Sequence, residues 1–103
     1  MELTILERLM LGSILPQQGD IVSLKIVQDL KLAVAFTEKE IADCEIDHKD
    51  DRITWNPEAE EYLKEIPIGP KAMTLIVGEL EKRNEEKVLV ADFISLYDKF
   101  MGE

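Results

Sequence analysis

The sequence has little of the residue types on which covalent and metal chemistry depend. Among its 103 residues there is one cysteine, Cys44, and one histidine, His48. A single cysteine forms no internal disulfide and no multi-cysteine zinc site, which fits a reducing compartment. Glycine-rich phosphate loops, the G-x-S-x-G nucleophile elbow and the H-E-x-x-H zinc motif are also missing from the sequence. We therefore expect a protein that is not an enzyme and that has no cofactor.

Long hydrophobic runs and positive charge are scarce as well. No apolar run approaches the roughly 20 residues that cross a bilayer, and the N-terminus lacks the positive region and the cleavage site of a secretory signal. Twelve Lys and Arg residues stand against 22 Asp and Glu, so the formal net charge is −10. This charge disfavours binding to nucleic acid or to anionic membranes. We expect a cytoplasmic protein that contacts no membrane and binds no nucleic acid directly.

The composition is otherwise that of a folded domain. Hydrophobic residues make up 46% of the chain, which is enough for one modest core, and a chain of this length has room for one domain. We expect residues 1–103 to form a single compact domain.

The first part of the sequence predicts three short helices. The apolar residues of the first helix recur at helical spacing: Leu3, Leu6, Leu9 and Met10. Asp20 is placed to cap a second helix, whose two apolar stripes reach Val34. Thr37 and Glu40 have the spacing of a capping box for a third helix that passes through Cys44.

In the middle of the sequence the spacing of the apolar residues changes from helical to alternating. Apolar and polar residues alternate between Ile46 and Trp55 around a polar turn, which predicts a β-hairpin. Asn56 followed by Pro57 predicts the start of a short helix through Leu63. An extended segment over residues 65–68 is then expected at a sheet edge, because Pro67 has no N–H to donate.

The last third predicts two amphipathic helices. One begins at Gly69–Pro70 and ends near Asn84. The second has an apolar face formed by Phe93, Leu96, Tyr97, Phe100 and Met101. The predicted fold is mainly α with a small β-hairpin (α+β). It has five to six short helices: three N-terminal helices, then the hairpin, then an antiparallel helix pair.

The acidity of the chain is concentrated in its middle. Residues 36–65 carry eleven acidic and four basic residues, whereas the segments before and after are nearly balanced. An acidic face of this kind suits a basic surface on a protein partner, such as one that normally holds nucleic acid. The alternative is a solvated face that serves solubility. The candidate partner-binding residues are Glu38, Glu40, Asp43, Glu45, Asp47, Asp50, Asp51, Glu58, Glu60 and Glu61.

Two other functions are open. The apolar surplus of the second helix and of Phe93, Tyr97 and Phe100 could build a homo-oligomer with a structural or assembly role. The order of three helices and a hairpin is also that of a winged helix, which would make the protein a nucleic-acid-binding regulator. The helix in the recognition position, residues 37–44, is acidic and would repel phosphate.

Three single residues have two interpretations each. His48 lies among aspartates that could bind a cation, but Asp is also common in turns because it bonds its own backbone. Cys44 is interpreted as a half-buried structural residue rather than a nucleophile. Trp55 is interpreted as a core residue that anchors the hairpin, with an exposed interface anchor as the alternative.

Several segments together resemble small proteins of tailed phages and prophages. These segments are LTILERL, ILPQQGD with SLKIVQDL, RITWN, IPIGPKA with IV three residues beyond, and ISLYDKF. The resemblance covers almost the whole chain, and its motifs are caps, turns and core stripes. It implies a phage-encoded accessory or regulatory protein. No functional residues can be transferred from the group, because its biochemical role is not established.

Overall fold

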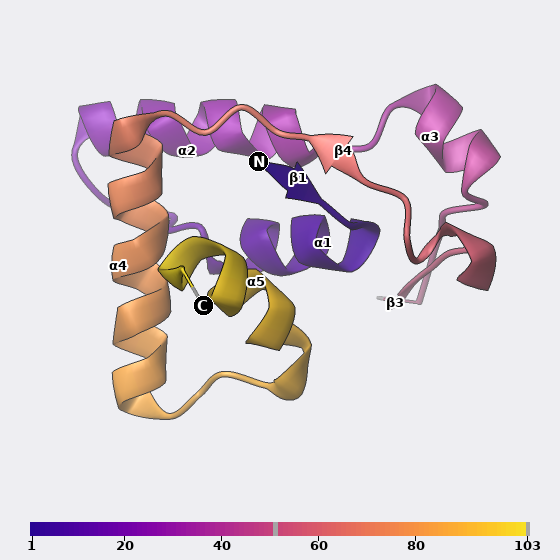
Figure 1. Ribbon diagram of the computed structural model, residues 1–103. Helices are drawn as coiled ribbons and strands as arrows, with labels where there is room; N and C mark the ends of the chain where they lie inside the picture. The colour runs from indigo at the N-terminus through magenta and orange to yellow at the C-terminus, as the bar shows by residue number, and fades with distance from the viewer. Residues whose placement is uncertain (51, 103) are drawn as a thin grey trace.

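The computed structural model describes residues 1–50 and 52–102 and confirms a mainly α fold with small β elements (Figure 1). Two antiparallel pairs of strands, β1 with β4 and β2 with β3, accompany the helices. The elements in chain order are β1 (Glu2–Leu3), α1 (Ile5–Ile14), α2 (Ile21–Val34), α3 (Glu38–Asp43), β2 (Asp47–Lys49), β3 (Arg52–Thr54), the 3-10 helix η1 (Pro57–Ala59), β4 (Lys64–Glu65), α4 (Pro70–Glu86), the 3-10 helix η2 (Ala91–Phe93) and α5 (Ile94–Met101).

Local capping signals set the starts of the second and third helices, as predicted. The Asp20 side chain accepts a 2.7 Å hydrogen bond from the Ser23 amide at the start of α2. At the start of α3, Thr37 and Glu40 bond each other's amides in a reciprocal capping box. These side chains satisfy amide groups that have no partner within the helix.

The first helix differs from its predicted stripe. Leu3 lies in β1 rather than on the helix, and Leu6, Leu9 and Met10 are only half-buried. The residues that α1 buries are Ile5, Glu7, Arg8, Leu11 and Ile14. The predicted apolar stripe of this helix is wrong because two charged residues, Glu7 and Arg8, lie on its buried face.

The predicted hairpin forms, with His48 opposite Ile53 in its register. The helix predicted after Pro57 is wrong beyond its first turn, because the chain from Tyr62 onward extends into β4. There β4 pairs with β1, and the backbones of Met1 and Ile66 extend the ladder with bonds of 2.8 and 3.0 Å. The extended segment was predicted, but its partner at the other end of the sequence was not.

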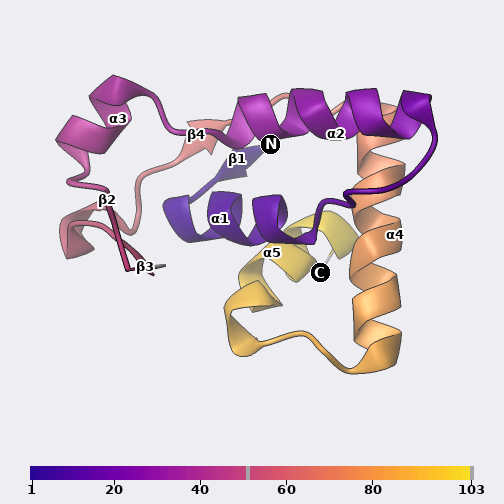
Figure 2. The ribbon, with the colours of Figure 1, turned by 180° about the vertical axis from the view of Figure 1, so that it is seen from behind.

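The core lies where α1, α2, α4 and α5 meet. In Figures 1 and 2, α1 and α2 run in opposite directions one above the other, and α4 stands across their ends. Helix α5 turns back toward α4 at an incline instead of lying along it (Figure 2). The buried core includes Leu11, Leu30, Ile76, Leu80 and Leu96. None of the helices described is long and apolar enough to cross a membrane.

Candidate functional site

The acidic segment forms a lobe beside the helical body. We call residues 36–65 the acidic lobe; it holds α3, the β2–β3 hairpin, η1 and β4. Figure 1 shows α3 and the hairpin on the right of the molecule, at the opposite side from α4. The strand β4 leads back into the body through its pairing with β1. The lobe is therefore attached at its two ends, by the end of α2 and by β4.

A buried ion pair fixes the lobe to the body. The guanidinium of Arg8, on α1, donates to both carboxylate oxygens of Glu40, on α3, at 2.9 and 3.1 Å. Both residues are at most 5% exposed. A bidentate pair of this kind fixes direction as well as distance, because both groups are planar. The pair therefore sets how α3 lies relative to α1.

The remaining donors of Arg8 hold the end of α2. Its Nε donates to the Val34 carbonyl at 3.1 Å, and one of its terminal nitrogens donates to the Ala35 carbonyl at 2.7 Å. The guanidinium carbon also lies 4.4 Å from the centre of the Phe36 ring, which is cation–π distance. One side chain thus joins α1, the C-terminal end of α2 and α3.

Glu40 has further partners within the lobe. It accepts a bond from the Thr37 amide in the capping box and a 2.9 Å bond from the Tyr62 hydroxyl. The hydrogen bonds from Arg8 are the main reason that the pKa of Glu40 falls to about 2, against the opposing effect of burial. The same carboxylate raises the pKa of Tyr62, because the phenol donates to it. Glu40 is therefore ionised, and both of its carboxylate oxygens accept hydrogen bonds from groups within the protein.

Glu40 therefore has to be removed from the predicted partner-binding set. Its carboxylate is buried against Arg8 and is not presented to a partner. Asp51 lies outside the residues that the structure describes. The other eight candidates are exposed, on α3, on the hairpin and around η1: Glu38, Asp43, Glu45, Asp47, Asp50, Glu58, Glu60 and Glu61.

Trp55 lies at the junction of the lobe and the body. It is half-buried and outside the main core cluster, so it is neither the core residue that the sequence predicted nor a fully exposed anchor. With Thr4, Leu6 and Glu60 it lines a recess of about 280 Å³. An aromatic ring and a carboxylate thus border the same recess on the acidic side of the molecule.

The described residues of the lobe include two side chains suited to covalent or metal chemistry, Cys44 and His48. Cys44 is buried, and burial together with the negative Glu40 and Asp43 raises the pKa of its thiol. A protonated, buried thiol is a poor nucleophile. His48 is exposed on β2. Within residues 1–50 and 52–102, no group of three His, Cys, Asp or Glu side chains is placed to hold a metal ion.

The buried network of Arg8, Glu40 and Tyr62 was not predicted from the sequence. A signal for part of it was present: Arg8 follows Ile5 by three residues and precedes Leu11 by three, so it occupies a core position of the helix. A charge at such a position calls for a partner of opposite sign.

Comparison of the chain with protein-family models, with curated proteins and with solved structures finds no match.

Proposed function

We propose that the protein is a non-enzymatic interaction protein, an accessory protein of the phage type, that presents the acidic lobe to a basic protein partner. The observation that carries the proposal is the set of exposed carboxylates on one lobe whose orientation is fixed by the Arg8–Glu40 pair. The fold sets the backbone positions of these carboxylates, so the lobe does not have to order its backbone on binding, which favours affinity. Their field also accelerates the approach of a basic partner.

The recess at Trp55 supports a basic partner in particular. Interfaces are often anchored by an aromatic residue in a partly enclosed position. A Lys or Arg side chain in this recess would stack on the Trp55 ring and pair with the Glu60 carboxylate, two interactions that favour the same cation. The lobe also exposes apolar surface at Ile41 and Leu63, 43% and 45% exposed, which adds contact area.

The exposed bases of the lobe would restrict which partners fit. Lys49 and Arg52 face each other in the register of the hairpin, so positive charge interrupts the acidic surface there. A basic partner needs a neutral or acidic patch at this point, because like charges in contact oppose binding. We therefore propose that the partner is selected by the arrangement of acidic and basic residues on the lobe and not by its net charge alone.

Capture of partners from a nuclease-treated bacterial lysate tests the proposal. The parent protein is compared with a variant in which Glu38, Asp43 and Glu60 are changed to Lys. The matched control changes three exposed acids outside the lobe, Glu81, Glu85 and Asp92, to Lys and so has the same net charge. We expect a basic protein to be retained by the parent and the control and lost by the lobe variant.

The isolated complex then gives a second measurement. Trp55→Ala should weaken its affinity at least about tenfold, as for an anchoring aromatic residue. If the partner is recovered equally on all three proteins, or is lost on the control as well as on the lobe variant, the acidic lobe is a solvated surface and not a binding site.

A further inference from the structure

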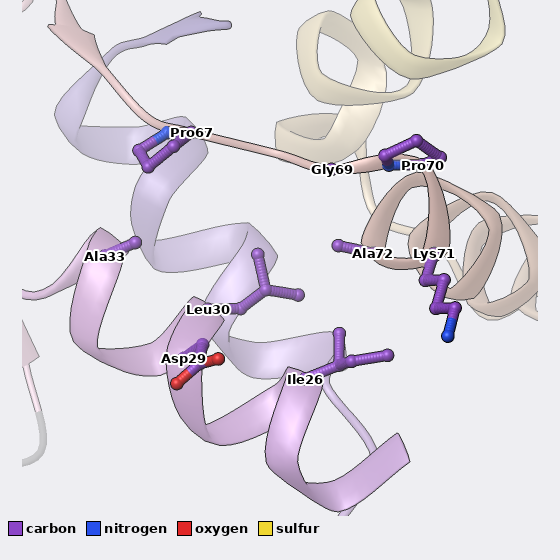
Figure 3. Close-up of a pocket in the computed structure, with 9 residues that line it drawn as sticks. All are labelled: Ile26, Asp29, Leu30, Ala33, Pro67, Gly69, Pro70, Lys71 and Ala72. Atoms are coloured by element: carbon purple, nitrogen blue, oxygen red, sulfur yellow. The ribbon is translucent and has the colours of Figure 1, made fainter. Parts of the chain in front are cut away.

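A groove runs between α2 and the segment that leads into α4, on a surface separate from the acidic lobe. Its volume is about 550 Å³. Figure 3 shows its two walls, one from α2 and one from the chain around the start of α4. We call it the α2 groove; it is lined by Ile26, Asp29, Leu30, Ala33, Pro67, Gly69, Pro70, Lys71 and Ala72.

The walls of the α2 groove are apolar and stiff. Figure 3 shows Ile26 and Leu30 pointing from α2 toward the start of α4. On the opposite wall, Pro67 and Pro70 have fixed φ angles and no N–H groups to satisfy. A groove with such walls is preformed, so an occupant does not have to order it.

The apolar surface of the groove continues along α2. Val22 precedes Ile26 by four residues and Ala33 by eleven, which places the three on one face of the helix. Val22 is 56% exposed, although it is a large apolar residue. The apolar surface therefore extends past the groove toward the N-terminal end of α2.

The two walls carry one charge of each sign. Asp29 lies on the α2 wall and Lys71 on the opposite wall, and both are exposed. Neither side chain takes part in any ion pair found among residues 1–50 and 52–102. An occupant that satisfies both must carry a base opposite Asp29 and an acid opposite Lys71.

We propose that the α2 groove is the interface with a second copy of this chain. A two-fold axis presents the same surface from both copies, so an interface that contains one acid and one base on opposite walls can complement itself. Asp29 of each copy then pairs with Lys71 of the other, and the apolar walls and Val22 are covered by their counterparts. This inference does not depend on the function proposed for the acidic lobe.

The charge distribution is compatible with such a dimer in spite of the net charge of −10. The lining of the groove contains one acid, Asp29, and one base, Lys71, so the surface that would pair carries no net charge. The α2 residues of the groove end at Ala33, and the exposed acids of the lobe begin at Glu38 on α3, outside the groove lining (Figure 1).

The sequence suggested two apolar regions for self-association, the second helix and the C-terminal aromatic residues, and the α2 groove involves the first of them. Of the three C-terminal residues that were expected to contribute, Phe93 and Phe100 are buried within the protein, and Tyr97 is half-buried. The surface of α2, in contrast, is open. Of the two apolar regions considered from the sequence, the second helix therefore carries the proposal.

Sedimentation equilibrium from low to high micromolar concentration tests the dimer. We expect the parent mass to rise from 11.8 kDa toward twice that value. Lys71→Glu places two carboxylates together at both symmetric contacts, and it should raise the dissociation constant at least about tenfold. The charge swap Asp29→Lys with Lys71→Glu keeps the parent's net charge, and it should restore the constant to within about threefold.

A matched control separates the local contact from the general rise in negative charge. Lys82→Glu makes the same change at an exposed position of α4 outside the groove. Its dissociation constant should stay near that of the parent, and far-ultraviolet circular dichroism should show all variants folded. A parent that remains monomeric at the highest concentration overturns the proposal and leaves the groove to a segment of another protein. Equal weakening by Lys71→Glu and Lys82→Glu, or no rescue by the swap, overturns it too.

Discussion

Glu7 and Arg8 are consecutive residues of α1, and each is only 1% exposed. Their side chains form ion pairs with different parts of the fold. Glu7 accepts a 2.6 Å bond from the Lys99 ammonium on α5. Arg8 binds Glu40 on α3. The first helix thus connects the C-terminal helix on one side with the acidic lobe on the other, through two neighbouring charges.

These pairs specify geometry more than they add stability. Removing two charges from water costs several kcal/mol, and a close pair roughly regains that cost. The bidentate contact between Arg8 and Glu40 nevertheless allows one arrangement of α3 against α1, whereas apolar contacts tolerate several. In the interaction proposed for the acidic lobe, this fixed arrangement would keep α3 and its exposed acids in one orientation.

Glu40→Gln should destabilise the protein by about 3–5 kcal/mol, because it leaves the Arg8 guanidinium buried without a counter-charge. Urea unfolding followed by circular dichroism measures the loss. Glu38→Gln, an exposed position on the same helix, is the control and should change the free energy of unfolding by less than about 0.5 kcal/mol.

The double variant Arg8→Met with Glu40→Gln tests whether the two residues act as a unit. Removing both charges avoids the unpaired group, so the double variant should lose less stability than the sum of the two single variants. A loss equal to that sum would contradict the coupling that the geometry indicates.

Stability should fall in acid through Glu40. Its pKa is about 2 in the folded protein against an ordinary value of 4.5, so the unfolded chain takes up the proton first as pH falls. The contribution of Glu40 is complete above pH 4.5 and is lost between there and pH 2, and by linkage it amounts to about 3 kcal/mol. Urea unfolding across this range, for the parent and for Glu40→Gln, measures it. The gap between the two curves should close as the pH falls, and a constant gap would rule out Glu40 as the source.

Lys99→Met should destabilise the protein by about 1–3 kcal/mol, because it removes the charged donor from a buried carboxylate. Burial acts to raise the pKa of Glu7, and the hydrogen bonds from Lys99, Thr4 and Ser95 together outweigh it and lower the pKa. Without Lys99 the pKa of Glu7 should therefore rise, which a carbon-detected nuclear magnetic resonance titration measures. Lys82→Met, an exposed change on α4, should leave both quantities unchanged.

The predictable parts of the fold are those encoded by neighbouring residues. Asp20, the Thr37–Glu40 box and the Gly69–Pro70 start are local signals, and the helices begin where these signals place them. The pairing of β1 with β4 joins residues more than 60 positions apart, and two-residue strands have too little alternation to be detected.

The candidate site was predictable as a charge distribution but not as an arrangement. Eight of the proposed carboxylates are exposed, because acidic side chains normally remain in water. Glu40 differs from them through Arg8, which is 32 residues away, and through its bonds with Tyr62 and with Thr37 in the capping box. A count of charges treats all acids alike, so it cannot separate the one that holds the lobe from those that face outward.

The end of α4 offers a stabilising change. Lys87 caps the helix with a left-handed backbone, φ 59°, whereas α5 ends with Gly102 in the same conformation. A residue with a Cβ atom is strained there by about 1 kcal/mol, and glycine is not. Lys87→Gly should therefore raise the free energy of unfolding by about 0.5–1 kcal/mol in urea unfolding. The same substitution two residues earlier, Glu85→Gly, falls inside the helix and should lower it by about 1 kcal/mol. Destabilisation by both changes would mean that the Lys87 side chain contributes more to the helix end than its backbone strain costs.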